Sequence, residues 1–169
     1  LAGSIPASLP DSIYSDIMER LEEKEVMIVV DATKDLLVNV LKYHPFLIKP
    51  NNHELGDIFG VEIRERDQVA PYAKKLREMG ARNVLVSMAG KGAVLLAEDG
   101  SVYESPAPKG KLINAVGAGD SMVAGFTAGY MQKGSYEHAF KMGVSTGSAS
   151  AFSENFATKE EVEAIYKTL

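Results

Sequence analysis

The segment 117–120 reads Gly-Ala-Gly-Asp, and the small and apolar residues after it predict a helix to about Gln132. Its glycines allow a tight turn, so the segment is expected at a helix N-terminus, where unpaired N–H groups attract anions. Asp120 then has two interpretations. It is a helix cap, or it is a general base that takes a proton from a hydroxyl while neighbouring N–H groups hold the developing negative charge. The motif alone leaves both open.

A second candidate follows a short apolar run, where Asn51 and Glu54 stand three residues apart and can share one helix face. In a functional interpretation Glu54 holds Mg²⁺ through water and Asn51 orients phosphate or metal-bound solvent, because Mg²⁺ prefers one or two carboxylates and keeps its other waters. In a structural interpretation the two residues form a capping box. Lys49 either reaches a phosphate or is solvated.

The segment 87–92 reads Ser-Met-Ala-Gly-Lys-Gly and only loosely resembles a phosphate-binding loop. The spacing of a P-loop is absent. Ser87, Gly90 and Gly92 are therefore candidates for nucleotide contacts, with a plain glycine turn as the alternative.

Two further segments carry weaker signals. Small residues between Gly143 and Ser148 allow close approach of a flat group, either a purine ring or another helix. Gly3 and Ser4 either hydrogen-bond a substrate hydroxyl or phosphate, or simply make a turn. The sequence does not decide either case.

The elements that position these residues alternate between short apolar strands and amphipathic helices, which predicts an α/β fold with a parallel sheet and helices on both faces. The strands are expected at 26–30, 46–48 and 84–87, a hairpin at 93–97 and 101–104, and helices at 13–24, 36–41, 52–59, 67–79, 119–133, 135–152 and 158–168. Ligands bind beyond the carboxyl ends of such strands. That rule selects the segments after Ala2, Ile48 and Ser87 and the turn at Gly117.

Composition limits the function classes. The 169 residues are 46% hydrophobic with a net charge of −5, which favours a single domain over 1–169 and argues against a nucleic-acid partner or an anionic membrane surface. The chain has no cysteine and no apolar run near the roughly 20 residues of a membrane span. A soluble, cytoplasmic protein is therefore expected. Because the sequence begins without Met and inside a turn, we expect a piece of a longer protein.

Four motifs occur together and in order. The opening segment 2–6 resembles a Ser-Gly-Ser-Leu-Pro turn, the segment 49–55 reads Lys-Pro-Asn-x-x-Glu-Leu, 87–92 follows, and 116–122 reads Val-Gly-Ala-Gly-Asp-Ser-Met. In this order and spacing they resemble the C-terminal part of the ribokinase-like (pfkB-type) carbohydrate kinases. Within that family they look most like the hexose-phosphate kinase branch, meaning 1-phosphofructokinase or tagatose-6-phosphate kinase.

The resemblance implies a three-layer α/β/α sandwich and an ATP- and Mg²⁺-dependent transfer of phosphate to a sugar phosphate. Asp120 would take the proton from the acceptor hydroxyl, and Glu54 and Asn51 would organise Mg²⁺. The other implied contacts are Gly117, Ala118 and Gly119 with the developing charge, Lys49, Ser87, Gly90, Gly92, Asn114, Gly143 and Ser148 with the nucleotide, and Gly3 and Ser4 with the sugar phosphate. A homodimer of the full-length protein is left open.

The chain also departs from the family pattern. Ile113-Asn114-Ala115 precedes Val116 where Asn-Ser or Ser-Thr is more usual, and Ala7-Ser8 replaces a residue followed by glycine. The N-terminal half that carries the sugar-binding region and the small lid sheet is missing. The alternatives are therefore a nucleotide-binding fragment without kinase activity, and a family kinase for another sugar or a nucleoside. A dinucleotide-binding oxidoreductase fits poorly, since no Gly-x-Gly-x-x-Gly follows the first strand.

Overall fold

The computed structural model describes residues 1–6 and 8–169, which form two compact units. Unit 1 comprises Leu1–Ser87 and Val94–Val102, and unit 2 comprises Met88–Ala93 and Tyr103–Leu169. The departure at Ala7-Ser8 falls partly on Ala7, which lies outside the described residues.

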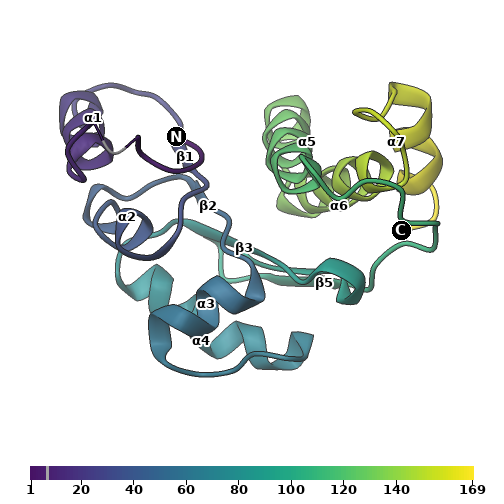
Figure 1. The fold of residues 1–169 in the computed structure, drawn as a ribbon, viewed down its shortest axis with the longest axis horizontal. Helices are drawn as coiled ribbons and strands as arrows, with labels where there is room; N and C mark the ends of the chain where they lie inside the picture. The colour runs from purple at the N-terminus through teal and green to yellow at the C-terminus, as the bar shows by residue number, and fades with distance from the viewer. Residues whose placement is uncertain (7) are drawn as a thin grey trace. The chain divides into compact units, whose positions relative to one another are not determined.

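Unit 1 alternates strands with helices, as the hydrophobic pattern predicts (Figure 1). Its elements are α1 (Ile13–Leu21), β1 (Val29–Val30), α2 (Lys34–Val38), η1 (Leu41–Tyr43), β2 (Leu47–Ile48), α3 (Asn52–Phe59), η2 (Arg66–Gln68), α4 (Val69–Glu78), β3 (Asn83–Ser87) and β4 (Ala93–Leu96), of which Ala93 belongs to unit 2. The helices α3 and α4 pack on β3.

The sheet has the order β1-β2-β3-β4-β5, where β5 is Val102–Ser105. The strands β1, β2 and β3 are parallel, with Val29 opposite Leu47 and Leu47 opposite Asn83. Leu47, Ile48 and the apolar residues of β3 are completely buried, as expected for parallel strands that are covered on both faces. The α/β class and the mostly parallel sheet are confirmed.

The first strand is shorter than predicted. The pattern predicts a strand over 26–30, but Val26 and Met27 are 52% and 44% exposed and only Val29–Val30 form β1. The amide of Val26 donates to Lys24 O at 2.8 Å, which closes a local turn, and pairing with the next strand begins at Ile28 O. A local hydrogen bond has therefore replaced the start of the ladder.

The helix predicted over 36–41 is also interrupted. The α-helical turns of α2 stop at Val38, and a separate 3₁₀ turn occupies Leu41–Tyr43. The residues at the break are Val38, Asn39 and Val40, all of which are weaker helix formers than the leucines beside them. The low helix propensity of these three residues explains why the spacing of apolar residues alone predicted one uninterrupted helix.

Unit 2 is built around three helices, α5 (Ala118–Lys133), α6 (Tyr136–Ala151) and α7 (Lys159–Tyr166), together with the 3₁₀ turn η3 (Ala89–Lys91). The first two helices cross at very short range, because each presents glycines to the other. A Cβ atom on Gly125 would lie 2.6 Å from Met142 O, and one on Gly143 would lie 3.0 Å from Met122 O. The predicted capping box of Thr158 and Glu161 begins α7.

His138 links the three helices. Its Nδ1 lies 2.7 Å from the Tyr166 hydroxyl and its Nε2 lies 3.3 Å from Gln132 Oε1. Desolvation, and to a lesser extent the charge of Lys133, lower the pKa of His138 below its ordinary value of 6.5. The unfolded chain therefore binds more protons than the native one as the pH falls below that value.

This shift predicts a pH-dependent stability. The contribution of His138 to the free energy of unfolding is present above about pH 6.5. It is lost as the pH falls through the lowered pKa of His138 in the native protein. We expect the free energy of unfolding, measured by urea titration, to fall slightly more over this window in the natural chain than in the His138→Gln variant. Equal pH slopes in the two proteins would contradict the prediction.

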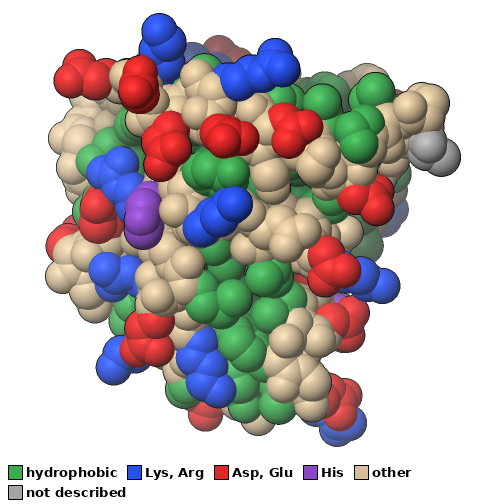
Figure 2. All heavy atoms as spheres, turned by 90° about the vertical axis from the view of Figure 1, so that its left-hand side faces the viewer, with side chains coloured by type: hydrophobic (Ala, Val, Ile, Leu, Met, Phe, Trp, Pro, Cys, Tyr) green, Lys and Arg blue, Asp and Glu red, His purple; other side chains and the backbone are tan. Residues whose placement is uncertain are grey.

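Figure 2 shows acidic and basic side chains interspersed over the face it displays, with hydrophobic side chains between them. None of the helices in residues 1–6 and 8–169 has both the length and the apolar content needed to span a membrane.

Candidate functional site

In unit 1 the predicted residues gather where the parallel strands end. Lys49 follows β2 directly, Ser87 is the last residue of β3, and Asn51 forms a parallel bridge with Ser87. The sheet therefore brings Lys49, Asn51 and Ser87 together at the carboxyl ends of its strands. Ligands of parallel sheets are expected to bind there.

Asn51 and Glu54 form the capping box of α3. Asn51 Oδ1 accepts from the amides of His53 and Glu54, both at 2.9 Å, and Glu54 Oε2 accepts from the amide of Asn51 at 2.8 Å. The structural interpretation is thus confirmed. The second carboxylate oxygen of Glu54 and the amide nitrogen of the Asn51 side chain have no hydrogen-bond partner within the described part of the chain, so both remain available to a ligand.

Lys49 is not solvated, and that alternative is wrong. Its side chain is 8% exposed, and its ammonium lies 3.2 Å from Asp31 Oδ2. Asp31 directly follows β1, so the pair joins the ends of two neighbouring strands. Sequence reasoning assigned no role to Asp31. The signal that could have found it was its position, since it is an acidic residue at the carboxyl end of a strand.

The turn at Gly3 is held by hydrogen bonds from two other segments. Gly3 N donates to Asp31 O at 3.0 Å, and the Tyr14 hydroxyl donates to Ala2 O at 2.8 Å. Gly3 has a φ of +83°, which favours glycine, so it has a structural reason to be there. Ser4 is exposed beside this turn. The part played by Tyr14 has no signature in the sequence.

The two glycines of the predicted nucleotide loop that lie in unit 2, Gly90 and Gly92, differ in how strictly the fold requires a glycine. Gly92 has a φ of +95°, and a Cβ atom there would collide with Ser105 O and lie 2.6 Å from Pro106 C. Gly90 has no such requirement, because a Cβ atom on it would meet nothing within 4 Å. Gly92 is therefore needed by the fold, whereas the open backbone at Gly90 leaves room for a ligand.

This difference predicts opposite outcomes for two matched substitutions. Gly92→Ala is expected to cost about 2 kcal/mol of unfolding free energy, because it adds strain at a positive φ and a collision with Ser105. Gly90→Ala should stay within about 0.5 kcal/mol of the natural chain. Chemical denaturation of both variants measures the difference, and equal losses would contradict it.

The tight turn that was predicted before a helix is formed in unit 2. Gly117 has a φ of +77° and precedes the 16-residue helix α5. The N–H groups of Gly117, Gly119 and Asp120 find no acceptor among the described residues. That of Ala118 donates to Ala115 O at 3.2 Å, and its contact with the developing charge stays a prediction. Three donors and a helix dipole remain for an anion.

Asp120 is the third residue of α5, and its side chain makes no cap hydrogen bond. The residue at the cap position is Gly117. Asp120 is also exposed, and within the described ranges its carboxylate has no hydrogen-bond or ion-pair partner. The interpretation of Asp120 as a helix cap is therefore wrong. Asn114, another candidate, accepts the amide of Val116 at 3.0 Å with its side-chain oxygen and so shapes the approach to the turn.

The small residues of α6 serve helix packing. Gly143 is buried against α5, and the place of its missing side chain is filled by Met122 and Phe126. That Gly143 borders the adenine ring stays a prediction. Ser148 is half-buried on the same helix, and its role stays a prediction.

The described residues offer few ligands for a metal ion. The described residues contain no group of three or more His, Asp or Glu side chains that could hold an ion. Mg²⁺ does not require such a group, because it is commonly held by one or two carboxylates, water and substrate phosphates. The unpaired oxygen of Glu54 fits this kind of site.

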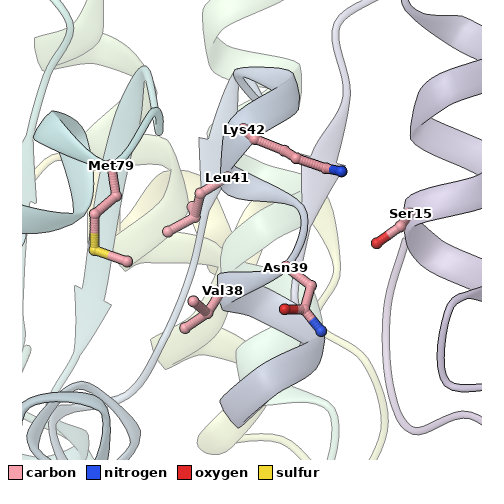
Figure 3. A pocket seen from close by; sticks show the side chains of 6 residues that line it. All are labelled: Ser15, Val38, Asn39, Leu41, Lys42 and Met79. Carbon is pink, nitrogen blue, oxygen red and sulfur yellow. The ribbon is translucent and has the colours of Figure 1, made fainter.

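A pocket of about 470 Å³ opens elsewhere in unit 1 (Figure 3). Its lining residues are Ser15, Val38, Asn39, Leu41, Lys42 and Met79. Leu41 and Lys42 precede β2, and Met79 precedes β3, so the pocket lies toward the amino ends of these strands. None of the predicted site residues lines it, and ligands of parallel sheets bind at the opposite ends.

Comparison with known proteins adds independent information. The sequence matches the pfkB family of carbohydrate kinases over residues 1–162. It is 49% identical to a 1-phosphofructokinase of Bacillus subtilis over 96% of this chain and 54% of that protein, and 30% identical to a D-tagatose-1-phosphate kinase of Bacillus licheniformis over the same shares. A crystal structure of a proposed phosphofructokinase from Staphylococcus aureus superimposes with a TM-score of 0.92 at 39% identity, covering 98% of this chain and 54% of that one. The chain thus spans about half the length of these relatives.

Proposed function

The chain belongs to the pfkB family of carbohydrate kinases, and from this membership we propose that it takes part in ATP-dependent phosphoryl transfer to a hydroxyl group of a sugar phosphate. The observation that carries the proposal is the N-terminus of α5, where three N–H groups have no acceptor among residues 1–6 and 8–169 and an exposed carboxylate makes no cap hydrogen bond. Donors and a base at one helix end suit a reaction that depends on positioning and electrostatics.

In the proposed step the acceptor oxygen forms a bond to the γ-phosphorus of ATP, and the bond from that phosphorus to the bridging oxygen of ADP breaks. Asp120 accepts the proton of the attacking hydroxyl. The N–H groups of Gly117, Gly119 and Asp120 stabilise the negative charge on the phosphate oxygens. Mg²⁺, when bound, neutralises phosphate charge, and Glu54 with Asn51 would hold it through water.

We propose fructose 1-phosphate as the first substrate to test. The support is the name of the Bacillus subtilis relative, which shares nearly half of its aligned residues with this chain. Tagatose 1-phosphate, tagatose 6-phosphate and fructose 6-phosphate complete the panel. A cytoplasmic location and a homodimer remain predictions.

The test is a coupled ADP-release assay on this polypeptide with Mg-ATP and each sugar phosphate, combined with calorimetric titration of Mg-ATP. Turnover that disappears in the Asp120→Asn variant would support the kinase. Binding of Mg-ATP without turnover would instead favour a nucleotide-binding segment, which is the alternative suggested by the chain spanning only half the length of its relatives. Folded protein that neither binds nor turns over would contradict both.

A further inference from the structure

The ion pair between Asp31 and Lys49 is unusual in its burial. The Lys49 side chain is 8% exposed and that of Asp31 is 19% exposed, and their nearest atoms lie 3.2 Å apart. The pairs Arg64–Glu62 and Arg82–Glu98 are much more exposed, with side chains at least 38% accessible. A buried ammonium loses much of its hydration, so it needs a partner that holds its charge.

The backbone around this pair is fixed on two sides. Asp31 N donates to Leu1 O at 2.8 Å, and Asp31 O accepts from Gly3 N at 3.0 Å, so the residue is clamped beside the first segment of the chain. Lys49 N lies 3.3 Å from its acceptor Val30 O, on the neighbouring strand. The backbones of both residues are therefore held in place by hydrogen bonds at the carboxyl ends of β1 and β2.

Lys49 also lies close in sequence to the capping box of α3. Only Pro50 separates it from Asn51, and the oxygen of Glu54 that is left unpaired belongs to the same turn. A flexible lysine beside such a turn would sample many rotamers, and ordering it would cost conformational entropy at the moment of binding. A lysine already held by a carboxylate avoids most of that cost.

We propose that Asp31 is a positioning residue, which holds the ammonium of Lys49 ready for a phosphate group of the nucleotide. This inference rests on the proposed function. An ammonium has three donors, and one carboxylate oxygen occupies one of them, so donors remain for a phosphate. In this proposal Asp31 acts through Lys49.

A purely structural role is the competing explanation, since removing one partner of a buried ion pair is destabilising wherever it occurs. The exchange of the two charges separates the explanations. The double variant Asp31→Lys with Lys49→Asp keeps an ion pair at this edge but moves the ammonium to the end of β1. A structural pair would be rescued by the exchange, whereas a positioned phosphate ligand would not.

The experiment measures the dissociation constant of Mg-ATP by calorimetry and the melting temperature by calorimetric scanning, for the natural chain and four variants. Lys49→Met removes the ammonium, Asp31→Asn removes its partner, Asp31→Glu is the conservative change, and the double exchange is the control for structure. We expect Lys49→Met and Asp31→Asn each to weaken binding about tenfold or more. Asp31→Glu should recover part of the affinity, and the double exchange should recover melting temperature but not affinity.

Several results would overturn the inference while leaving the proposed function intact. These are natural affinity in a folded Asp31→Asn protein, tighter binding in that variant, and full affinity in the double exchange. If Asp31→Asn does not fold, affinity in the folded Asp31→Glu and Lys49→Met proteins decides in its place. Failure of the natural chain to bind Mg-ATP contradicts the proposed function itself, and the inference falls with it.

Discussion

Replacing Asp120 by asparagine is expected to lower the turnover number by about 10²–10⁴-fold or more, because a positioned general base contributes on that order to proton transfer. The affinity for Mg-ATP should stay nearly unchanged. Asp120 makes no cap hydrogen bond, so the substitution removes the base without removing a contact that forms α5. The measurements are the ADP-release rate and the calorimetric affinity of the same preparation.

Glu137 offers a matched control for this prediction. It is an acidic residue in the first turn of α6, in the same unit, and it has no role in the proposed site. Glu137→Gln removes the same charge from a helix N-terminus and should cost about 0.3–1 kcal/mol of stability through the helix dipole, together with the exposed ion pair to Lys141 at 3.3 Å. Turnover should be unaffected by it. Loss of nucleotide binding in a folded Asp120→Asn protein would indicate a structural role for this carboxylate after all.

Replacing Gly125 by valine is expected to lower the free energy of unfolding by about 3 kcal/mol. The Cβ atom alone would collide with Thr146 Oγ1 and lie 2.6 Å from Met142 O, and this backbone oxygen of α6 cannot move without the helix. Two more methyl groups have no space at this crossing. Urea titration followed by circular dichroism measures the loss.

Valine at Ala128 is the control, since this residue is on an exposed part of the same helix. Ala128→Val carries the lower helix propensity of valine and should cost less than about 1 kcal/mol. Gly125→Ala sharpens the comparison. On helix propensity alone it should stabilise by about 1 kcal/mol, so a destabilised Gly125→Ala protein identifies the packing collision as the cause. A stabilised one would show that the helices can separate.

The parts of the fold that depend on local sequence were predictable. The buried strands at 46–48 and 84–87 follow from short apolar runs, and the ends of α3 and α7 follow from capping residues. The length of β1 was not predictable, because an apolar run does not reveal that Val26 closes a local turn instead of pairing. The break after α2 depends on modest differences in helix propensity between residues, and the spacing of apolar residues does not reveal these differences.

The candidate site divides in a similar way. The ends of β2 and β3 could be located from sequence, so Asn51 and Ser87 were identifiable, and the glycines of 117–119 marked the turn before Asp120. The partner of Lys49 was not, because the contact joins residues of two neighbouring strands and no spacing in the chain encodes it. The packing of Gly143 against α5 was not predictable either, since small residues look the same in sequence whether a ligand or a helix approaches them.

The crossing of α5 and α6 has a consequence for how unit 2 folds. Only Gly134 and Ser135 separate the two helices along the chain, so their contacts need little loop-closure entropy. Contacts of low sequence separation form quickly, and we expect this helical pair to be structured before β5 finds its place in the sheet. Pulsed hydrogen exchange during refolding would then protect the amides of α5 and α6 first. Early protection of Val102–Ser105 would reverse that order. The turn that presents Asp120 would in that case form after β5, together with the helix that it begins.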